Sequence, residues 1–207
     1  MKPWLFDIIA CPIDKHYPLK LFIFSYESSE KDFESFYNLF KKREIDALPI
    51  EDTIHIHTKK KDIFVKDNVV IEEKPIKIYL KLMIESIEEL VHFEDRSSSD
   101  YSKSVINLLI SDVKEKLTNF LKKTDIQDLT SVLPELFLVN TFKVDVEIES
   151  GVLYCEECHR WFPIIDTIPQ MLPDKYRDKD AELQFLKTNK NLLDEKFFKQ
   201  NLKPFNI

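Results

Sequence analysis

The positions of three cysteines constrain how this chain can fold. Cys155 and Cys158 form a C-x2-C pair, and at this spacing a tight backbone turn can point two thiolates at one metal ion, as in a zinc knuckle. The third cysteine, Cys11, lies 144 residues before Cys155. If all three bind one ion, the two chain ends must meet at a single site. We therefore predict a β-rich module that is built from both ends.

A closed structural zinc site needs four ligands, and the cysteines supply three. Two residues near Cys11 are candidates for the fourth. Asp14 lies at the x2 spacing from Cys11 that a second knuckle would use, whereas His16 lies at x4 and is chemically the more usual ligand. We predict a zinc site with ligands Cys11, Cys155 and Cys158 and a fourth ligand from either Asp14 or His16.

Glycine is nearly absent from the chain. Gly151 is the single glycine among 207 residues, whereas average usage of about 7% would give about fourteen. Phosphate-binding loops and dinucleotide fingerprints need several glycines, because glycine lets the backbone approach a ligand closely. The sequence therefore argues against an enzyme that binds a nucleotide or a methyl donor itself. It also contains no diagnostic Ser-His-Asp arrangement, and we assign no catalytic residue.

The balance of charges argues against direct binding of nucleic acid. The chain has 37 Asp and Glu against 30 Lys and Arg, which gives a net charge of −7. Affinity for nucleic acid comes largely from basic side chains that neutralise phosphates, so a role with RNA would depend on a partner. The sequence has no apolar run of eighteen residues and no signal peptide pattern. We expect a cytoplasmic protein that does not enter membranes.

Hydrophobic periodicity separates β-rich ends from a helical middle. Residues 19–26 and 144–148 alternate with period two, and Ser150-Gly151 is typical of a turn before Cys155. Helical spacing is found in the middle of the chain, over residues 29–40, 78–93 and 105–121, with a further helix over 125–137 broken by Pro134.

The predicted fold class is α+β. We expect a β module formed by residues 1–28 and 141–173, with residues 29–140 as a mostly helical insertion between them. Residues 174–207 have a sparse apolar stripe among many charges, which predicts a C-terminal tail that is either helical or partly disordered.

Two stretches resemble a known family. One runs from Leu5 to Leu21 and contains Ala-Cys-Pro-Ile-Asp-Lys-His, and the other runs from Val152 to Leu172 and contains Tyr-Cys-Glu-Glu-Cys-His-Arg-Trp-Phe-Pro-Ile-Ile-Asp-Thr-Ile-Pro. Both resemble the small zinc-ribbon activator subunit of tRNA, rRNA and release-factor methyltransferases. The chain differs in having Asp14 or His16 where many members have a second cysteine. It also has Asp166-Thr-Ile-Pro where the family usually has Asp-Gly-Ile-Pro, so a turn there must form without glycine.

The resemblance implies a zinc-ribbon-like module and a regulatory subunit without catalytic activity of its own. Such a subunit would form a heterodimer with one or more SAM-dependent methyltransferases, cover their apolar surface and help them hold the methyl donor. RNA would be contacted only through the partner, in tRNA modification and translation.

The segment 161–172 is the predicted docking surface. Pro163 and Pro169 each remove a backbone donor, so a strand here should be short and lie at a sheet edge. A partner could add a strand to that edge and bury apolar side chains. The candidate partner-binding residues are Phe162, Ile164, Ile168 and Met171.

Two other functions are consistent with the C-x2-C pair. A zinc-ribbon module could contact RNA or the ribosome directly, which would require a basic face despite the negative net charge. A thiol oxidoreductase could use Cys155 and Cys158, but that chemistry is typical of a C-x-x-C at a helix start in a thioredoxin-like βαβ unit. The sequence lacks that context.

Overall fold

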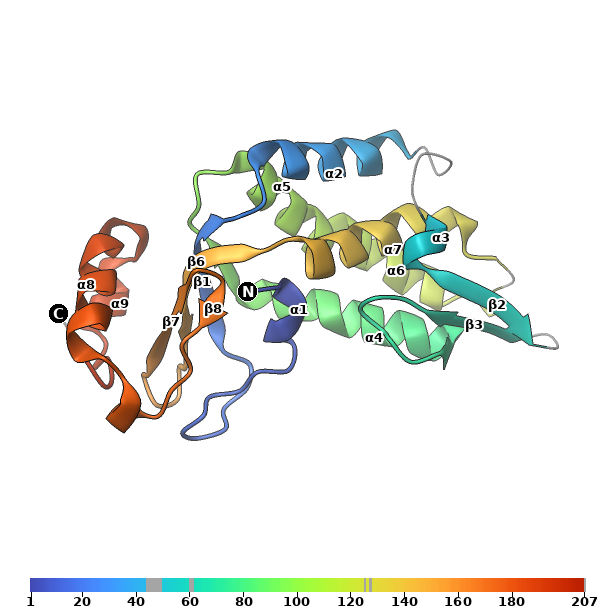
Figure 1. The fold of residues 1–207 in the computed structure, drawn as a ribbon. Helices are drawn as coiled ribbons and strands as arrows, with labels where there is room; N and C mark the ends of the chain where they lie inside the picture. The colour runs from blue at the N-terminus through green and yellow to red at the C-terminus, as the bar shows by residue number, and fades with distance from the viewer. Residues whose placement is uncertain (44–49, 60–61, 125, 127, 207) are drawn as a thin grey trace. The chain divides into compact units, whose positions relative to one another are not determined.

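The computed structural model describes residues 1–43, 50–59, 62–124, 126 and 128–206. They form two compact units, and each is described by itself. Unit 1 contains residues 1–28, 92–98 and 147–207, and unit 2 contains residues 29–91 and 99–146. Both units contain helices and strands (Figure 1), so the predicted α+β class is confirmed. Unit 1 is built from both chain ends and also includes residues 92–98 and 174–207, which lie outside the expected module bounds.

A five-stranded sheet forms the centre of unit 1, in the order β5-β1-β6-β7-β8. β1 lies inside the sheet, parallel to β5 and antiparallel to β6, and β8 is the last strand at the other edge. A short helix, α1 (Pro3–Phe6), starts with proline in its first turn and precedes Cys11. The strands are β1 (Lys20–Tyr26), β5 (Phe93–Asp95), β6 (Ile148–Tyr154), β7 (Trp161–Ile165) and β8 (Ile168–Pro169).

Gly151 lies inside β6, so the turn expected at Ser150-Gly151 is wrong. A Cβ atom at Gly151 would lie 2.5 Å from the backbone oxygen of Phe22 on β1. The pairing of β1 with β6 also shifts register here, between Ile23 and Ser25. Glycine is therefore needed where two strands approach closely at an irregular point of the ladder.

The turn between β7 and β8 forms without glycine. Asp166 and Thr167 have φ angles of 48° and 66°, both in the left-handed region. Two such residues are typical of a type I′ hairpin turn, which usually contains glycine or asparagine. The N–H of Thr167 donates to the carbonyl oxygen of Glu149 at 2.9 Å. Because a β-branched residue rarely adopts positive φ, this turn is strained.

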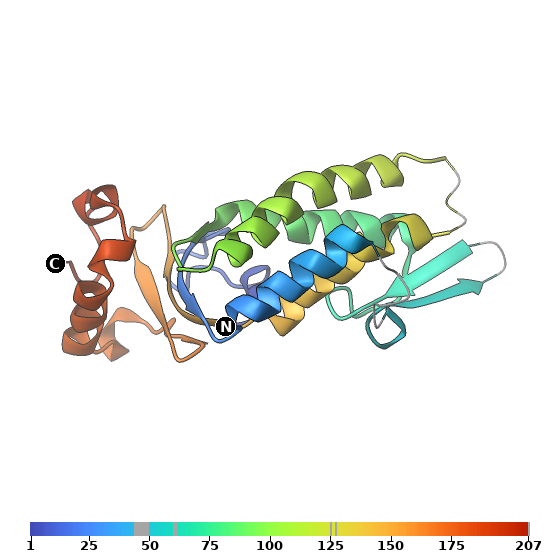
Figure 2. The same cartoon turned by 90° about the horizontal axis from the view of Figure 1, so that it is seen from above.

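Residues 174–206, called the C-terminal segment below, fold against one face of the unit 1 sheet, and Figures 1 and 2 both show α8 and α9 beside that sheet. The segment contains η6 (Asp174–Tyr176), α8 (Lys179–Thr188), η7 (Lys190–Leu192) and α9 (Glu195–Lys199). Its apolar side chains pack on those of β1, β6 and β7. The buried cluster is Phe22, Phe24, Val152, Tyr154, Trp161, Leu186, Leu193, Phe197 and Leu202.

Unit 2 is mostly helical and has a three-stranded sheet in the order β2-β3-β4. Ser29 caps α2 in a reciprocal capping box with Asp32. The helices are α2 (Glu30–Lys42), α3 (Ile50–Thr53), α4 (Ile76–Glu88), α5 (Asp100–Leu108), α6 (Lys114–Leu121) and α7 (Leu133–Asn140), with η2 (Glu89–His92), η3 (Leu109–Val113), η4 (Thr130–Val132) and η5 (Thr141–Asp145). The strands are β2 (His55–Lys59), β3 (Asp62–Lys66) and β4 (Lys74–Pro75).

Two expectations for the second half of the chain are wrong. Pro134 lies in the first turn of α7, where proline is tolerated because its missing N–H has no helical partner, so it starts the helix and does not break it. The alternation from Val144 does not begin a strand, because residues 141–145 continue as the π-helical turn η5 and β6 starts at Ile148. Among the described residues, no helix is long and apolar enough to span a membrane.

Candidate metal centre

The turn between β6 and β7, residues 155–160, forms what we call knuckle 2. The N–H of Cys155 donates to the carbonyl oxygen of Arg160 at 2.8 Å, and the N–H of His159 donates to that of Cys155 at 2.9 Å. His159 has φ 58°, in the left-handed region. These bonds close the loop tightly, so Cys155 and Cys158 are held as a pair on one turn.

The turn at residues 11–16, called knuckle 1, repeats this arrangement. The N–H of Cys11 donates to the carbonyl oxygen of His16 at 3.0 Å, and the N–H of Lys15 donates to that of Cys11 at 2.9 Å. Lys15 has φ 64°. Position by position, Asp14 in knuckle 1 therefore corresponds to Cys158 in knuckle 2. This correspondence favours Asp14 over His16 as the ligand from knuckle 1.

The two knuckles bring four side chains together. The ligand atoms of Cys11, Asp14, Cys155 and Cys158 all lie within 4.8 Å of one another. The Sγ atoms of Cys11 and Cys158 are 3.6 Å apart, and Cys155 Sγ is 3.5 Å from Asp14 Oδ2. Tetrahedral zinc, with bonds of about 2.3 Å to sulfur and about 2.1 Å to oxygen, has edges of about 3.7 Å between sulfurs and about 3.6 Å between sulfur and oxygen. The cluster therefore fits the size and donor chemistry of a zinc site.

The chain matches the family model of the Trm112p-like protein over residues 2–166. It belongs to the Trm112p-like family. The match includes both knuckles and all four residues of the cluster, and it confirms the resemblance found in the sequence. Searches of curated proteins and of solved structures gave no significant match. The C-terminal segment lies beyond the range of this Trm112p-like match.

His16 does not join the cluster found among the described residues of this Trm112p-like chain. Its backbone N–H donates to Asp14 Oδ1 at 3.0 Å, and its carbonyl oxygen closes knuckle 1. His16 therefore supports the Asp14 carboxylate through its backbone.

Two thiols and the carboxyl group of the cluster have pKa values that are shifted in opposite directions. Burial raises the pKa of the Cys11 thiol to about 11, and burial likewise raises the pKa of Cys155. For Asp14, desolvation opposes ionisation, but hydrogen bonds from the His16 N–H and the three thiols together lower the pKa of the carboxyl group. The Cys11 and Cys155 thiols must therefore lose protons when a metal binds. Cys155 is one of the two thiols that an oxidoreductase would use, and its raised pKa is the opposite of the lowered pKa that activates a thiol.

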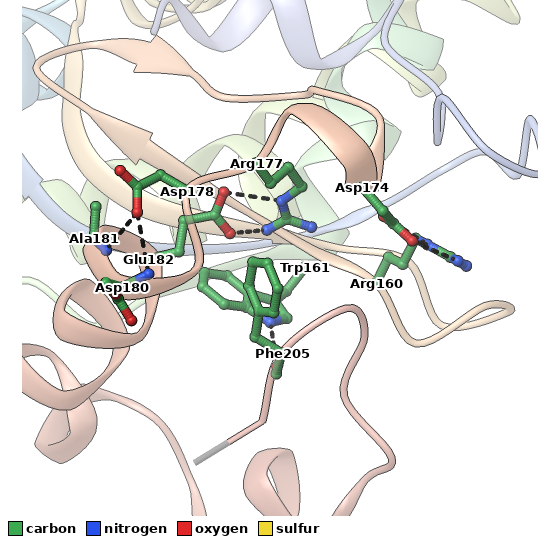
Figure 3. Close-up of polar contacts among 9 residues, drawn as sticks. All are labelled: Arg160, Trp161, Asp174, Arg177, Asp178, Asp180, Ala181, Glu182 and Phe205. Carbon is green, nitrogen blue, oxygen red and sulfur yellow. Dashed lines mark hydrogen bonds and ion pairs between the residues drawn. The ribbon is translucent and has the colours of Figure 1, made fainter.

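Arg160 places a positive charge beside the cluster. Its guanidinium binds the Asp174 carboxylate, with Nη2 to Oδ2 at 2.9 Å and Nε to each oxygen at 3.2 Å (Figure 3). The Asp174 carboxylate and a hydrogen bond to Cys158 raise the pKa of Arg160. The ion pair of Arg160 with Asp174 links knuckle 2 to the C-terminal segment.

Sequence reasoning missed both Arg160 and the buried Arg177. The side chain of Arg177 lies over the rings of Trp161, Phe162 and Phe205, and its guanidinium pairs with Glu182 (Figure 3). No sequence pattern indicated these partners, because they lie on separate elements.

The four predicted partner-binding residues differ in exposure. Phe162 and Ile164 are fully buried, Met171 is half-buried, and Ile168 is 59% exposed. Ile168 belongs to β8, the last strand of the sheet. A docking role, which stays a prediction for all four, is therefore most direct for Ile168 and Met171.

Proposed function

We propose that this protein is a non-catalytic subunit that binds and activates SAM-dependent methyltransferases acting on tRNA, rRNA or a release factor. The observation that supports this most is the family match over residues 2–166, since this family is known to the field for methyltransferase activation in general. The single glycine and the negative net charge agree with a role in which the partner binds the methyl donor and RNA.

We further propose that zinc is the metal, bound by Cys11, Asp14, Cys155 and Cys158. Four protein ligands leave no open coordination position, so zinc here would be structural. It would join knuckle 1, which leads into β1, to knuckle 2, which connects β6 and β7. The ion would thereby stabilise the module that a partner binds.

The proposed docking surface is the outer edge of the β7–β8 hairpin. β8 ends the sheet order, and Ile168 and Leu172 are 59% and 43% exposed. A partner strand could pair along this edge and cover both side chains, gaining backbone hydrogen bonds and apolar burial. Phe162 and Ile164, which are buried in the free chain, would support the hairpin from inside.

The test begins with capture of the full chain's partners from its native cell, followed by mass spectrometry. We expect methyltransferases among the captured proteins, and a purified one should gain solubility and activity when mixed with this chain. The isolated chain should methylate no RNA or release factor. Methyl transfer by the chain alone, or a captured set without any methyltransferase, would contradict the proposal.

A further inference from the structure

The residues that directly follow Cys158 hold the end of the C-terminal segment. The carbonyl oxygen of His159 accepts from the N–H of Lys203 at 2.9 Å, and the N–H of Trp161 donates to the carbonyl oxygen of Lys203 at 3.3 Å. The indole Nε1–H of Trp161 donates to the carbonyl oxygen of Phe205 at 3.0 Å. Lys203 thus forms a parallel bridge with Arg160, the residue directly before β7.

The same part of knuckle 2 also holds the beginning of the segment. Arg160, the second residue after Cys158, forms the ion pair with Asp174 (Figure 3). Three residues further on, Arg177 is buried against Trp161. Both ends of the C-terminal segment are therefore attached within three residues of a proposed metal ligand.

His159 links these contacts to the metal cluster. With φ 58° it adopts a conformation that a residue with a side chain keeps only when its surroundings hold it. Towards the cluster, His159 follows Cys158 directly in the chain, and its N–H donates to the carbonyl oxygen of Cys155. On the other side it is held by Lys203, and by its ring nitrogen Nδ1, 2.7 Å from the Tyr154 hydroxyl.

The Tyr154 hydroxyl in turn donates to the side chain of Gln200 in the C-terminal segment. A metal bound through Cys158 and a segment docked through Lys203 and Gln200 would therefore stabilise the same backbone conformation of knuckle 2. Two ligands that favour one conformation strengthen each other's binding.

We propose that metal binding at the cluster and docking of the C-terminal segment are coupled. The segment packs on knuckle 2 in its metal-bound shape and loosens from the sheet face when the metal leaves. This inference rests on the proposed metal centre and not on the methyltransferase partner. Because coupling is reciprocal, loosening the segment must weaken metal binding by the same factor by which metal loss loosens the segment.

The test uses two full-length variants of Lys203, an exposed residue. Lys203→Pro removes the N–H that donates to His159, whereas Lys203→Ala keeps both backbone groups and serves as the matched control. Zinc affinity is measured by competition with a chromophoric chelator. We expect Lys203→Pro to bind zinc about fivefold or more weakly than Lys203→Ala. Equal affinities of the two variants would overturn the coupling.

The reverse direction is measured by hydrogen exchange in the native sequence. Amide exchange in α8 and α9 should accelerate about fivefold or more when zinc is removed by chelator. Unchanged exchange in these helices would contradict the coupling. If zinc removal unfolds the whole chain, the zinc affinities of the two Lys203 variants alone decide whether the coupling exists.

The failure of this inference differs from failure of the proposed function. A chain that binds no zinc would remove the metal centre and the coupling together, while partner capture would still test the activator role. Equal zinc affinities of the Lys203 variants would remove the coupling alone.

Discussion

Knuckle 1 and knuckle 2 have the same backbone hydrogen-bond pattern but different surroundings. Outside the cluster, two contacts near knuckle 1 join residues close in the chain: Lys15 Nζ donates to the carbonyl oxygen of Pro12, and the Tyr17 hydroxyl donates to that of Asp7. Contacts around knuckle 2 reach the C-terminal segment, through Arg160 with Asp174 and through His159 with Lys203. The backbone turn that both knuckles share sets the direction of two ligands in each. The contacts around each knuckle determine which other segment a bound ion could stabilise.

The two knuckles also lead to different places in the sheet. Knuckle 1 leads into β1, which has neighbours on both sides, whereas knuckle 2 leads into the hairpin that ends at the edge strand β8. An interior strand has no free edge for a partner, and an edge strand has one. The docking surface is therefore expected on the side of knuckle 2.

The largest effect on zinc affinity is expected when one ligand is substituted in either knuckle. Cys158→Ser should lower zinc affinity about a hundredfold or more, because it replaces a thiolate ligand with a weak hydroxyl donor. Asp14→Asn should lower affinity by a comparable factor if Asp14 occupies the equivalent position. Chelator competition on both variants measures this. A loss below about threefold for Asp14→Asn would break the equivalence of the knuckles.

A charge on the edge hairpin should damage partner binding more than folding. Ile168→Asp should weaken methyltransferase binding about tenfold or more, because a desolvated charge replaces apolar burial of roughly 1.5 to 3 kcal/mol. The melting temperature should hardly change, since Ile168 is 59% exposed. Ile164→Asp is the matched contrast, because Ile164 is fully buried and its variant should unfold. Unchanged partner affinity for Ile168→Asp would place docking elsewhere.

Knuckle 1 has a carboxylate, Asp14, where knuckle 2 has a thiol, Cys158, and one substitution can make the two positions alike. Asp14→Cys should give a four-thiolate site and tighten zinc binding about tenfold, because thiolate is the better ligand for this borderline-soft ion. His16→Ala is the control and should leave zinc affinity unchanged, since His16 contributes through its backbone. If His16→Ala weakens binding more than Asp14→Asn does, the ligand assignment in knuckle 1 is wrong.

The sequence predicted that cysteines from both chain ends come together. It did not predict the fourth residue of the cluster or the place of Gly151. The C-x2-C pair and the distant Cys11 predicted a site that joins both chain ends, because ligand spacing follows from turn geometry. The preference for Asp14 over His16 as the proposed fourth ligand came from backbone hydrogen bonds, which composition does not reveal. Gly151 was misassigned because glycine is typical both of turns and of close strand approach, and the partner that requires it, Phe22, is distant in sequence.

The smallest expected effect concerns the strained turn after knuckle 2. Thr167→Gly should stabilise the chain by about 1 kcal/mol, because glycine adopts positive φ without the strain of a β-branched side chain. Urea unfolding of the full chain measures it. Thr167→Ala keeps a Cβ atom and should recover less of that free energy. Destabilisation by Thr167→Gly would show that the threonine side chain makes a contact that outweighs the strain.

The ligand set itself is tested most directly by X-ray absorption at the zinc edge of the loaded, full-length protein. We expect one zinc per chain with three sulfur neighbours at about 2.3 Å and one oxygen neighbour at about 2.1 Å. That result would show that both chain ends share the ion and that Asp14 completes its shell. A shell with two sulfurs, or with the outer scattering of an imidazole ring, would contradict the assignment of Cys11 and Asp14 to the site.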